Sequence, residues 1–290
     1  PICHLFLNGK KPIQHRSSYG LGEVIKAALD NHTEHLVISL GGIGSFDGGA
    51  GMLQALGATF YDDEAQIVDM RKGAYLIKYI RRIDLSGVHP QLTKVNIQLM
   101  SDFSSRLYGK KSEIMQTYES LDLSQNEAAE IDNLIWYFSE LFKNELKIAM
   151  GPIERGGAGG GIAAVLNSLY QAEILTSHEL VNQITHLENL IQQADLIIFG
   201  EGLKEEDQIL ETTTIRIAEL TQQYSKPAIA ICATNDKFDL FESLNVTAMF
   251  NTFIDMPDSY TDFKMGIQIR HYTVQALKLL KTQINLPLSS

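Results

Sequence analysis

Short apolar runs alternate with amphipathic segments along the whole chain. Runs that are apolar and rich in β-branched side chains are typical of buried strands, and five segments are predicted as strands: 36–40, 95–100, 196–199, 228–232 and 249–254. Apolar positions three or four residues apart predict helices over 24–29, 52–56, 124–146, 162–169, 179–193, 212–223 and 265–283. The longest of these helices begins with Ser124 and Glu127, the signature of a capping box.

The order of these elements predicts the fold class. Strand, glycine turn, helix and strand follow one another as in open, mostly parallel α/β sheets with helices on both faces. In such sheets ligands bind where the strands end at their carboxyl termini. The glycine-opened helix ends close to residue 172, so we expect two domains, residues 1–172 and residues 173–290. The first is expected to be a mixed α/β domain and the second a Rossmann-like α/β domain.

The first candidate site is the glycine-rich turn after the strand predicted at 36–40. Glycines let the backbone approach a ligand closely and point several N–H groups at it. The candidate ligand-binding residues of this turn are Gly42, Ser45, Gly48 and Gly49. Asp47 stands just before the next predicted helix, so its carboxylate either caps that helix or holds a substrate hydroxyl or a metal ion.

The second candidate site is the glycine cluster at 156–161, which opens the helix predicted at 162–169. A helix N-terminus favours anions through its unpaired amide N–H groups and the helix dipole. The alternative is that the glycines only allow tight helix packing. No Gly-Lys-Ser/Thr follows, so the turn is not a P-loop. The candidate anion-binding residues are Arg155, Gly157, Gly159, Gly160 and Gly161.

Two further strand ends carry carboxylates. Glu201 lies between Gly200 and Gly202 directly after the strand predicted at 196–199, a costly arrangement that favours a ligand-binding role over packing. Asp102 follows the strand predicted at 95–100, where a plain turn residue is the alternative. Carboxylate oxygens suit Mg²⁺, so Asp102 and Glu201 are the candidate metal ligands.

Composition narrows the class of protein. The 290 residues include 24 Lys and Arg against 35 Asp and Glu, a net charge of −11, and 44% are hydrophobic, which is enough for a core. The acidic balance argues against nucleic-acid and anionic-membrane partners. No apolar run reaches the length of a membrane span. The two cysteines, Cys3 and Cys232, are far apart, and no export signal is visible, so we expect a cytoplasmic protein.

Four ordered motifs carry a resemblance to a known family. Residues 18–29, 47–57, 157–161 and 194–202 resemble, in this order, segments of the bacterial glycerate kinase family of type I. The resemblance implies transfer of the γ-phosphate of ATP to a hydroxyl of D-glycerate with Mg²⁺, in a cleft between two α/β domains of which the first binds the substrate. It also implies that Asp47 orients or deprotonates the acceptor hydroxyl, and that Asp102 and Glu201 hold Mg²⁺ or polar groups of the ligands.

The chain departs from the family where cationic and hydroxyl-bearing side chains are expected. The family's Ser-Ala-Thr-Asn before the Asp is residues 43–46, Ile-Gly-Ser-Phe, and its Gly-Pro-Gln-Lys-Gly-Ala stretch has no lysine counterpart near 118–123. The family's N-terminal segment, which carries a lysine-bearing phosphate loop, is not found among these residues, so we expect either a piece cut from a longer chain or a naturally short protein. A weakened or non-catalytic ligand-binding protein on the same scaffold is therefore the alternative function. An incomplete sheet would leave an edge that needs covering, so a homodimer stays open.

Overall fold

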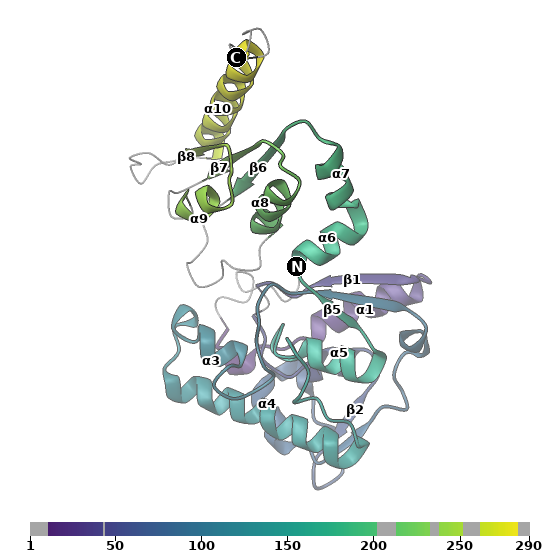
Figure 1. Ribbon diagram of the computed structural model, residues 1–290. Coiled ribbons are helices and arrows are strands. Elements are labelled where there is room, and N and C mark those ends of the chain that lie inside the picture. Colours follow the sequence, from purple (N-terminus) through teal and green to yellow (C-terminus); the bar gives the residue numbers. More distant parts are fainter. Residues whose placement is uncertain (1–10, 43, 202–212, 233–237, 252–261, 284–290) are drawn as a thin grey trace. The chain divides into compact units, whose positions relative to one another are not determined.

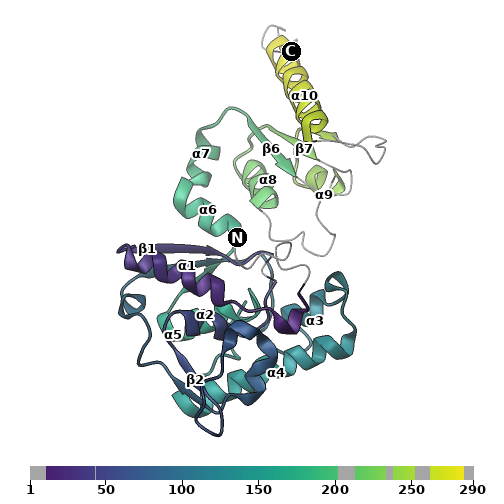
Figure 2. The same cartoon turned by 180° about the vertical axis from the view of Figure 1, so that it is seen from behind.

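The computed structural model describes residues 11–42, 44–201, 213–232, 238–251 and 262–283. The chain divides into two compact units, Pro1–Thr176 and Ser177–Ser290 (Figures 1 and 2). Each unit is a mixed α/β structure with its own parallel sheet, which confirms the predicted fold class. The division of roles between a substrate-side domain and a Rossmann-like domain stays a prediction.

Unit 1 contains a three-stranded parallel sheet. Its strand order is β1 (His35–Ser39), β4 (Asn96–Met100) and β5 (Glu173–Leu175), and the first residue of β1 pairs with the first residue of β4. β1 and β4 match two predicted strands to within one residue. β5 was not predicted because three residues are too few to show a period. The helix Ile162–Tyr170, α5, packs against both β4 and β5.

The described part of unit 1 contains the α-helices α1 (Tyr19–Asp30), α2 (Ala50–Ala55), α3 (Glu113–Thr117), α4 (Gln125–Leu146) and α5 (Ile162–Tyr170). The predicted capping box of α4 is present. The Ser124 hydroxyl accepts a hydrogen bond from the Glu127 backbone N–H, and the Glu127 carboxylate accepts one from the Ser124 N–H at 2.9 Å. This reciprocal pairing satisfies two amides that a helix start leaves open. α4 buries Ile131, Ile135 and Phe138 in the core.

A small antiparallel pair completes unit 1 on the side away from the parallel sheet's strands. It consists of β2 (Thr59–Tyr61) and β3 (Arg82–Asp84). Short 3-10 helices connect the larger elements: η1 (Ile13–His15), η2 (Met70–Lys72), η3 (Ala74–Tyr79), η4 (Pro90–Thr93) and η5 (Glu119–Leu121). These elements were missed in the sequence because each is too short for a hydrophobic period to emerge.

Unit 2 has a parallel sheet in the order β6 (Ile197–Glu201), β7 (Ala228–Cys232) and β8 (Ala248–Asn251). Its helices are α6 (Ser177–Thr185), α7 (Leu187–Gln193), α8 (Thr213–Gln223), α9 (Phe238–Ser243) and α10 (Asp262–Gln283). The single helix predicted over 179–193 is two helices, because His186 has a left-handed φ of 52° that ends α6 and starts α7. Within the described ranges, no helix combines the length and apolar character that crossing a bilayer requires.

Candidate functional site

Three loops meet at the carboxyl end of the sheet of unit 1. They are the loop after β1, the loop after β4 and the glycine turn that precedes α5. The Gly48 N–H donates to the Gly160 carbonyl at 2.9 Å, and the Gly157 N–H donates to the Ser105 carbonyl at 3.3 Å. The sequence-predicted turns at 41–49 and 156–161 are therefore parts of one cluster. Sequence reasoning did not include Ser105 in that cluster.

The glycines of the second turn are required by their backbone angles and by close packing. Gly159, Gly160 and Gly161 have φ angles of +65°, +63° and +101°, where side chains are strained. A Cβ atom on Gly160 would lie 2.1 Å from the Ser45 carbonyl oxygen, and one on Gly157 would lie 2.1 Å from a carbonyl of the loop after β4. Tight packing, the alternative to anion binding, thus accounts sterically for Gly157 and Gly160.

The amides of this turn are mostly taken by protein carbonyls. Backbone oxygens accept hydrogen bonds from the N–H groups of residues 156–158 and 161–164. The Gly160 N–H instead donates to the Glu113 carboxylate, with 3.2 Å between nitrogen and Oε2, and the Gly159 amide also stabilises the ionised form of this carboxylate. In this structure the two amides bind a carboxylate of the chain itself, and binding of a ligand anion by the turn stays a prediction.

Glu113 is a functional candidate that the sequence did not reveal. It is the first residue of α3 and is half-buried. Burial raises the pKa of its carboxyl to about 7, against the amides of Gly160 and Gly159, which lower it. A carboxyl group with such a pKa exchanges its proton near neutral pH, which is a property of functional carboxyl groups.

Asp132 on α4 fixes the segment that leads into α3. Its two carboxylate oxygens accept hydrogen bonds from the Gly109 N–H at 3.0 and 2.8 Å, and Oδ1 also accepts one from the Ser112 hydroxyl at 2.5 Å. Burial raises the pKa of Asp132, opposed by these hydrogen bonds. Asp132 lies on the buried stripe of α4, and a carboxylate on an apolar stripe is the sequence signal that could have identified it.

Two hydroxyl groups near the turn are buried without a hydrogen-bond partner in the part of the chain that the structure describes. They are Ser45 Oγ and Ser105 Oγ, on residues that are 0% and 2% exposed. Ser105 Oγ faces the turn, since a Cβ atom on Gly157 would lie 2.7 Å from it. A buried polar group without a partner costs about 1–3 kcal/mol, so these hydroxyls mark a place where a ligand would add stability.

Asp47 is fully buried and saturated with hydrogen bonds. Its Oδ2 accepts from the Ser18 N–H at 2.8 Å, the Ser18 hydroxyl at 3.0 Å, the Gly51 N–H at 3.2 Å and the Ser17 hydroxyl at 3.4 Å, while Oδ1 accepts from the Gly49 N–H at 3.1 Å. A carboxylate offers about four lone-pair sites. Burial raises the pKa of Asp47, and the bonds from Ser18, Gly51 and Gly49 oppose that rise. These contacts anchor the loop after β1 to the start of α2 and to Ser18, while a role of Asp47 towards a substrate stays a prediction.

The remaining predicted residues of unit 1 lie around this cluster. Gly42 is exposed with a φ of +68°, and Gly49 is the N-cap of α2. Arg155 is half-buried at the start of the glycine turn, with a left-handed φ of +55°. Asp102 is half-buried two residues after β4. All four therefore stand next to the carboxyl end of the sheet or to the turn that reaches it.

The third predicted turn belongs to unit 2. Glu201 is the last residue of β6, where it pairs with Cys232, and Gly200 pairs with Ile231. Gly202 lies outside the described residues. Because Asp102 and Glu201 are in different units, a metal site shared by them stays a prediction. Over the described ranges, no group of three or more His, Cys, Asp or Glu side chains is placed to hold a metal ion.

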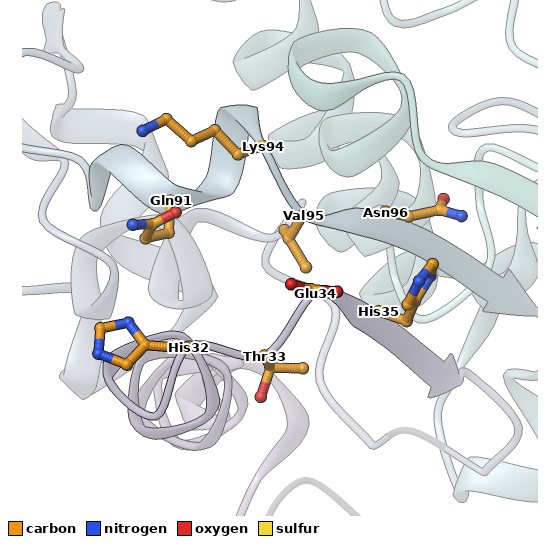
Figure 3. Close-up of a pocket in the computed structure, with 8 residues that line it drawn as sticks. All are labelled: His32, Thr33, Glu34, His35, Gln91, Lys94, Val95 and Asn96. Atoms are coloured by element: carbon orange, nitrogen blue, oxygen red, sulfur yellow. The ribbon is translucent and has the colours of Figure 1, made fainter.

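A pocket of about 480 Å³ opens elsewhere in unit 1, at the amino ends of β1 and β4 (Figure 3). Figure 3 shows His35 beside its register partner Asn96, and Glu34 and Lys94 also line the pocket. The four side chains are exposed. None of the sequence-predicted site residues lines this pocket, which lies at the opposite strand ends from the three-loop cluster.

Comparison with known proteins gives one family over most of the chain. A model described as the glycerate kinase family matches residues 4–268. The glycerate kinase of Halalkalibacterium halodurans is 31% identical over 231 residues, which are 80% of this chain and 60% of that protein. The glycerate 2-kinase of Escherichia coli K12 is 29% identical over 236 residues, 81% of this chain and 61% of that protein. The chain thus spans about three fifths of these relatives.

A solved structure extends the likeness to the fold. The crystal structure of a Salmonella typhimurium LT2 protein assigned as glycerate kinase 2 superposes with a TM-score of 0.79 and 26% sequence identity. The alignment covers 96% of this chain and 72% of that chain. Both units are therefore included in the comparison, which agrees with the resemblance found from the sequence motifs.

Proposed function

Because this chain belongs to the glycerate kinase family, we propose that it takes part in transferring the γ-phosphoryl group of ATP to a hydroxyl of D-glycerate. Family membership over residues 4–268 is the observation that carries the proposal. The three-loop cluster supports it, because ligands of open α/β sheets bind at the carboxyl ends of the strands. The chain covers part of its relatives' length, so the activity of the whole protein is a proposal.

The acid substrate is assigned to the three-loop cluster of unit 1. The unpartnered hydroxyls of Ser45 and Ser105 are donors and acceptors for a small polyhydroxy acid. The glycine turn at 157–161 would bind an anionic group of the ligand. Asp47 acts as a positioning residue, because its hydrogen bonds hold the loop after β1 to the starts of α1 and α2.

We propose that the protein binds Mg²⁺ together with ATP, because carboxylate side chains stand at the ends of two strands. Mg²⁺ is held in kinases by one or two carboxylates together with substrate phosphates. Asp102 is a half-buried carboxylate at the end of β4 and suits this role, and Glu201 at the end of β6 is the second proposed ligand. When bound, Mg²⁺ would neutralise charge on the phosphate oxygens. We also infer a cytoplasmic protein, as expected for an enzyme of ATP and a small acid.

A coupled assay tests the proposal directly. The full chain is mixed with D-glycerate, ATP and Mg²⁺, and the release of ADP is measured. We expect turnover of about 1 s⁻¹ or faster, within the ordinary range of enzymes. Asp102→Asn should lower this rate by at least about tenfold, whereas Asp63→Asn, on an exposed residue of unit 1, should leave it unchanged.

Absence of turnover would contradict the proposal. If the chain binds D-glycerate or ATP yet releases no ADP, the protein is the non-catalytic member that the lost cationic positions allow. Calorimetric titration with each ligand separates that outcome from a chain that binds neither.

A further inference from the structure

The glycine turn before α5 leaves only a narrow set of amides for any ligand. Protein carbonyls accept the N–H groups of residues 156–158 and 161–164. The amides of Gly159 and Gly160 remain, and the Glu113 carboxylate binds there, with 3.2 Å between Oε2 and the Gly160 nitrogen. This pair of amides next to a helix N-terminus therefore already binds a carboxylate group.

We propose that the amides of Gly159 and Gly160 are a subsite for the carboxylate of the acid substrate, and that Glu113 is an internal ligand which the substrate displaces. The inference rests on the proposed function for the identity of the acid. It adds a specificity-determining residue, Glu113, and it assigns the carboxylate rather than a phosphate of the ligands to this turn.

The orphaned hydroxyls beside the turn point to an external ligand. Ser105 Oγ is buried, has no partner within the described part of the chain, and lies against Gly157. Ser45 Oγ is likewise buried and without a partner there, and the Ser45 carbonyl packs against Gly160. The side chain of Glu113 satisfies neither hydroxyl. A small hydroxy acid would pair with the amides of the turn through its carboxylate. Its own hydroxyl groups would pair with the two serine hydroxyls.

Glu113 is the less buried partner of this contact. Gly157, Gly159 and Gly160 are buried, whereas Glu113 as a whole residue is half-buried. Its carboxylate is buried against the turn. α3 is a short helix whose start is held by Asp132 through the Ser112 hydroxyl. The proposal requires only that the Glu113 side chain moves away from the two amides.

Calorimetric titration of the full chain with D-glycerate tests the displacement. Removing the competing carboxylate in Glu113→Ala should tighten the dissociation constant by about tenfold, because a charge-assisted hydrogen bond no longer has to be broken. Glu113→Gln keeps the shape but loses the charge, so its affinity should lie between those of the wild type and Glu113→Ala. Glu130→Ala, an exposed acid on α4, is the matched control and should bind as the wild type does.

Two further ligands identify the group that binds. Glycerol has the hydroxyls without the carboxylate, so its affinity should not change in Glu113→Ala. Inorganic phosphate should also show no gain. A gain for phosphate without one for D-glycerate would overturn the assignment of the turn to a carboxylate.

The proposal is overturned if the wild type binds D-glycerate and both Glu113 variants, with unchanged thermal melting temperatures, bind it no more tightly. This failure is distinct from failure of the proposed function. If the wild type turns over D-glycerate but the variants bind it no more tightly, the subsite proposal fails and the proposed kinase function stands. If the variants bind D-glycerate more tightly but the wild type shows no turnover, the proposed kinase function fails and the subsite proposal stands.

Discussion

Asp47 joins three parts of unit 1 through one carboxylate. Its oxygens accept hydrogen bonds from Ser18, which precedes α1, and from Gly49 and Gly51 at the start of α2. The loop after β1 is thereby held against two helix N-termini, where negative charge is favourable. From the sequence, a cap and a catalytic group could not be told apart, because that distinction depends on donors contributed by Ser17 and Ser18, about thirty residues away.

Asp47→Asn is expected to destabilise unit 1 by at least about 2 kcal/mol. In Asn, an NH2 group that cannot accept hydrogen bonds replaces one carboxylate oxygen of Asp47. This group would face N–H or O–H donors, because donors surround both carboxylate oxygens in the wild type. Urea unfolding followed by circular dichroism measures the change. Asp63→Asn, on an exposed residue, is the control and should stay within about 0.5 kcal/mol of the wild type. Equal midpoints for the two variants would disprove the anchoring role.

Glu113 gives the folded state a characteristic pH dependence. Its pKa rises from 4.5 to about 7 on folding, so between these pH values the native state binds more protons than the unfolded state. Stability from this group is therefore present below pH 4.5 and is lost as the pH rises towards 7. Glu113→Gln removes that loss. We expect this variant to exceed the wild type in unfolding free energy by about 2 kcal/mol at pH 8, and by clearly less at pH 5.

Thermal or urea unfolding of both proteins at pH 5 and pH 8 checks this expectation. A difference that stays constant across the two pH values would show that the carboxyl group titrates normally in the folded protein.

At the scale of elements, the sequence patterns worked where a segment is long or fully apolar. The runs at 36–40 and 228–232 became β1 and β7, and the Ser124 capping box starts α4. Patterns failed where an element has only three residues, as in β2 and β3. The glycine turn precedes α5 as predicted, but its contact with Glu113 left no local signal in the sequence, because the contact between Glu113 and Gly160 spans 47 residues.

Gly160→Ala should disrupt the glycine turn more than any exposed glycine substitution in unit 1. The added Cβ would meet the Ser45 carbonyl oxygen at 2.1 Å, and the φ of +63° is unfavourable for alanine. We expect a loss of at least about 2 kcal/mol in unfolding free energy. Gly41→Ala is the matched control, since nothing lies within 4 Å of its Cβ position. A Gly160→Ala protein as stable as Gly41→Ala would refute the close packing described for the turn.

At the scale of the whole molecule, each unit has buried clusters of its own over the described residues. The large cluster contains residues from Ile13 to Ala172, and the smaller clusters of unit 2 contain residues from Phe199 to Ala276. We therefore expect each unit to unfold as its own cooperative block. From the sequence, the end of the glycine-opened helix predicts a boundary near residue 172, but the sequence could not show how either core is packed.

The single tryptophan makes this separation measurable. Trp136 lies on α4 in unit 1 and is 47% exposed. In urea, its fluorescence should report only the unfolding of unit 1, whereas far-ultraviolet circular dichroism reports both units. We therefore expect the two probes to give different midpoints. Coincident curves with one shared midpoint would show a single cooperative block instead.

A crystal structure of the full chain with D-glycerate tests the central claim most directly. We predict that the carboxylate of the bound acid lies within hydrogen-bond distance of the Gly159 and Gly160 amides. The hydroxyl of Ser105 or Ser45 should form a hydrogen bond with the ligand, and the Glu113 carboxylate should have moved away from the amides. D-glycerate bound outside the three loops, with Glu113 still on Gly160, would contradict the account.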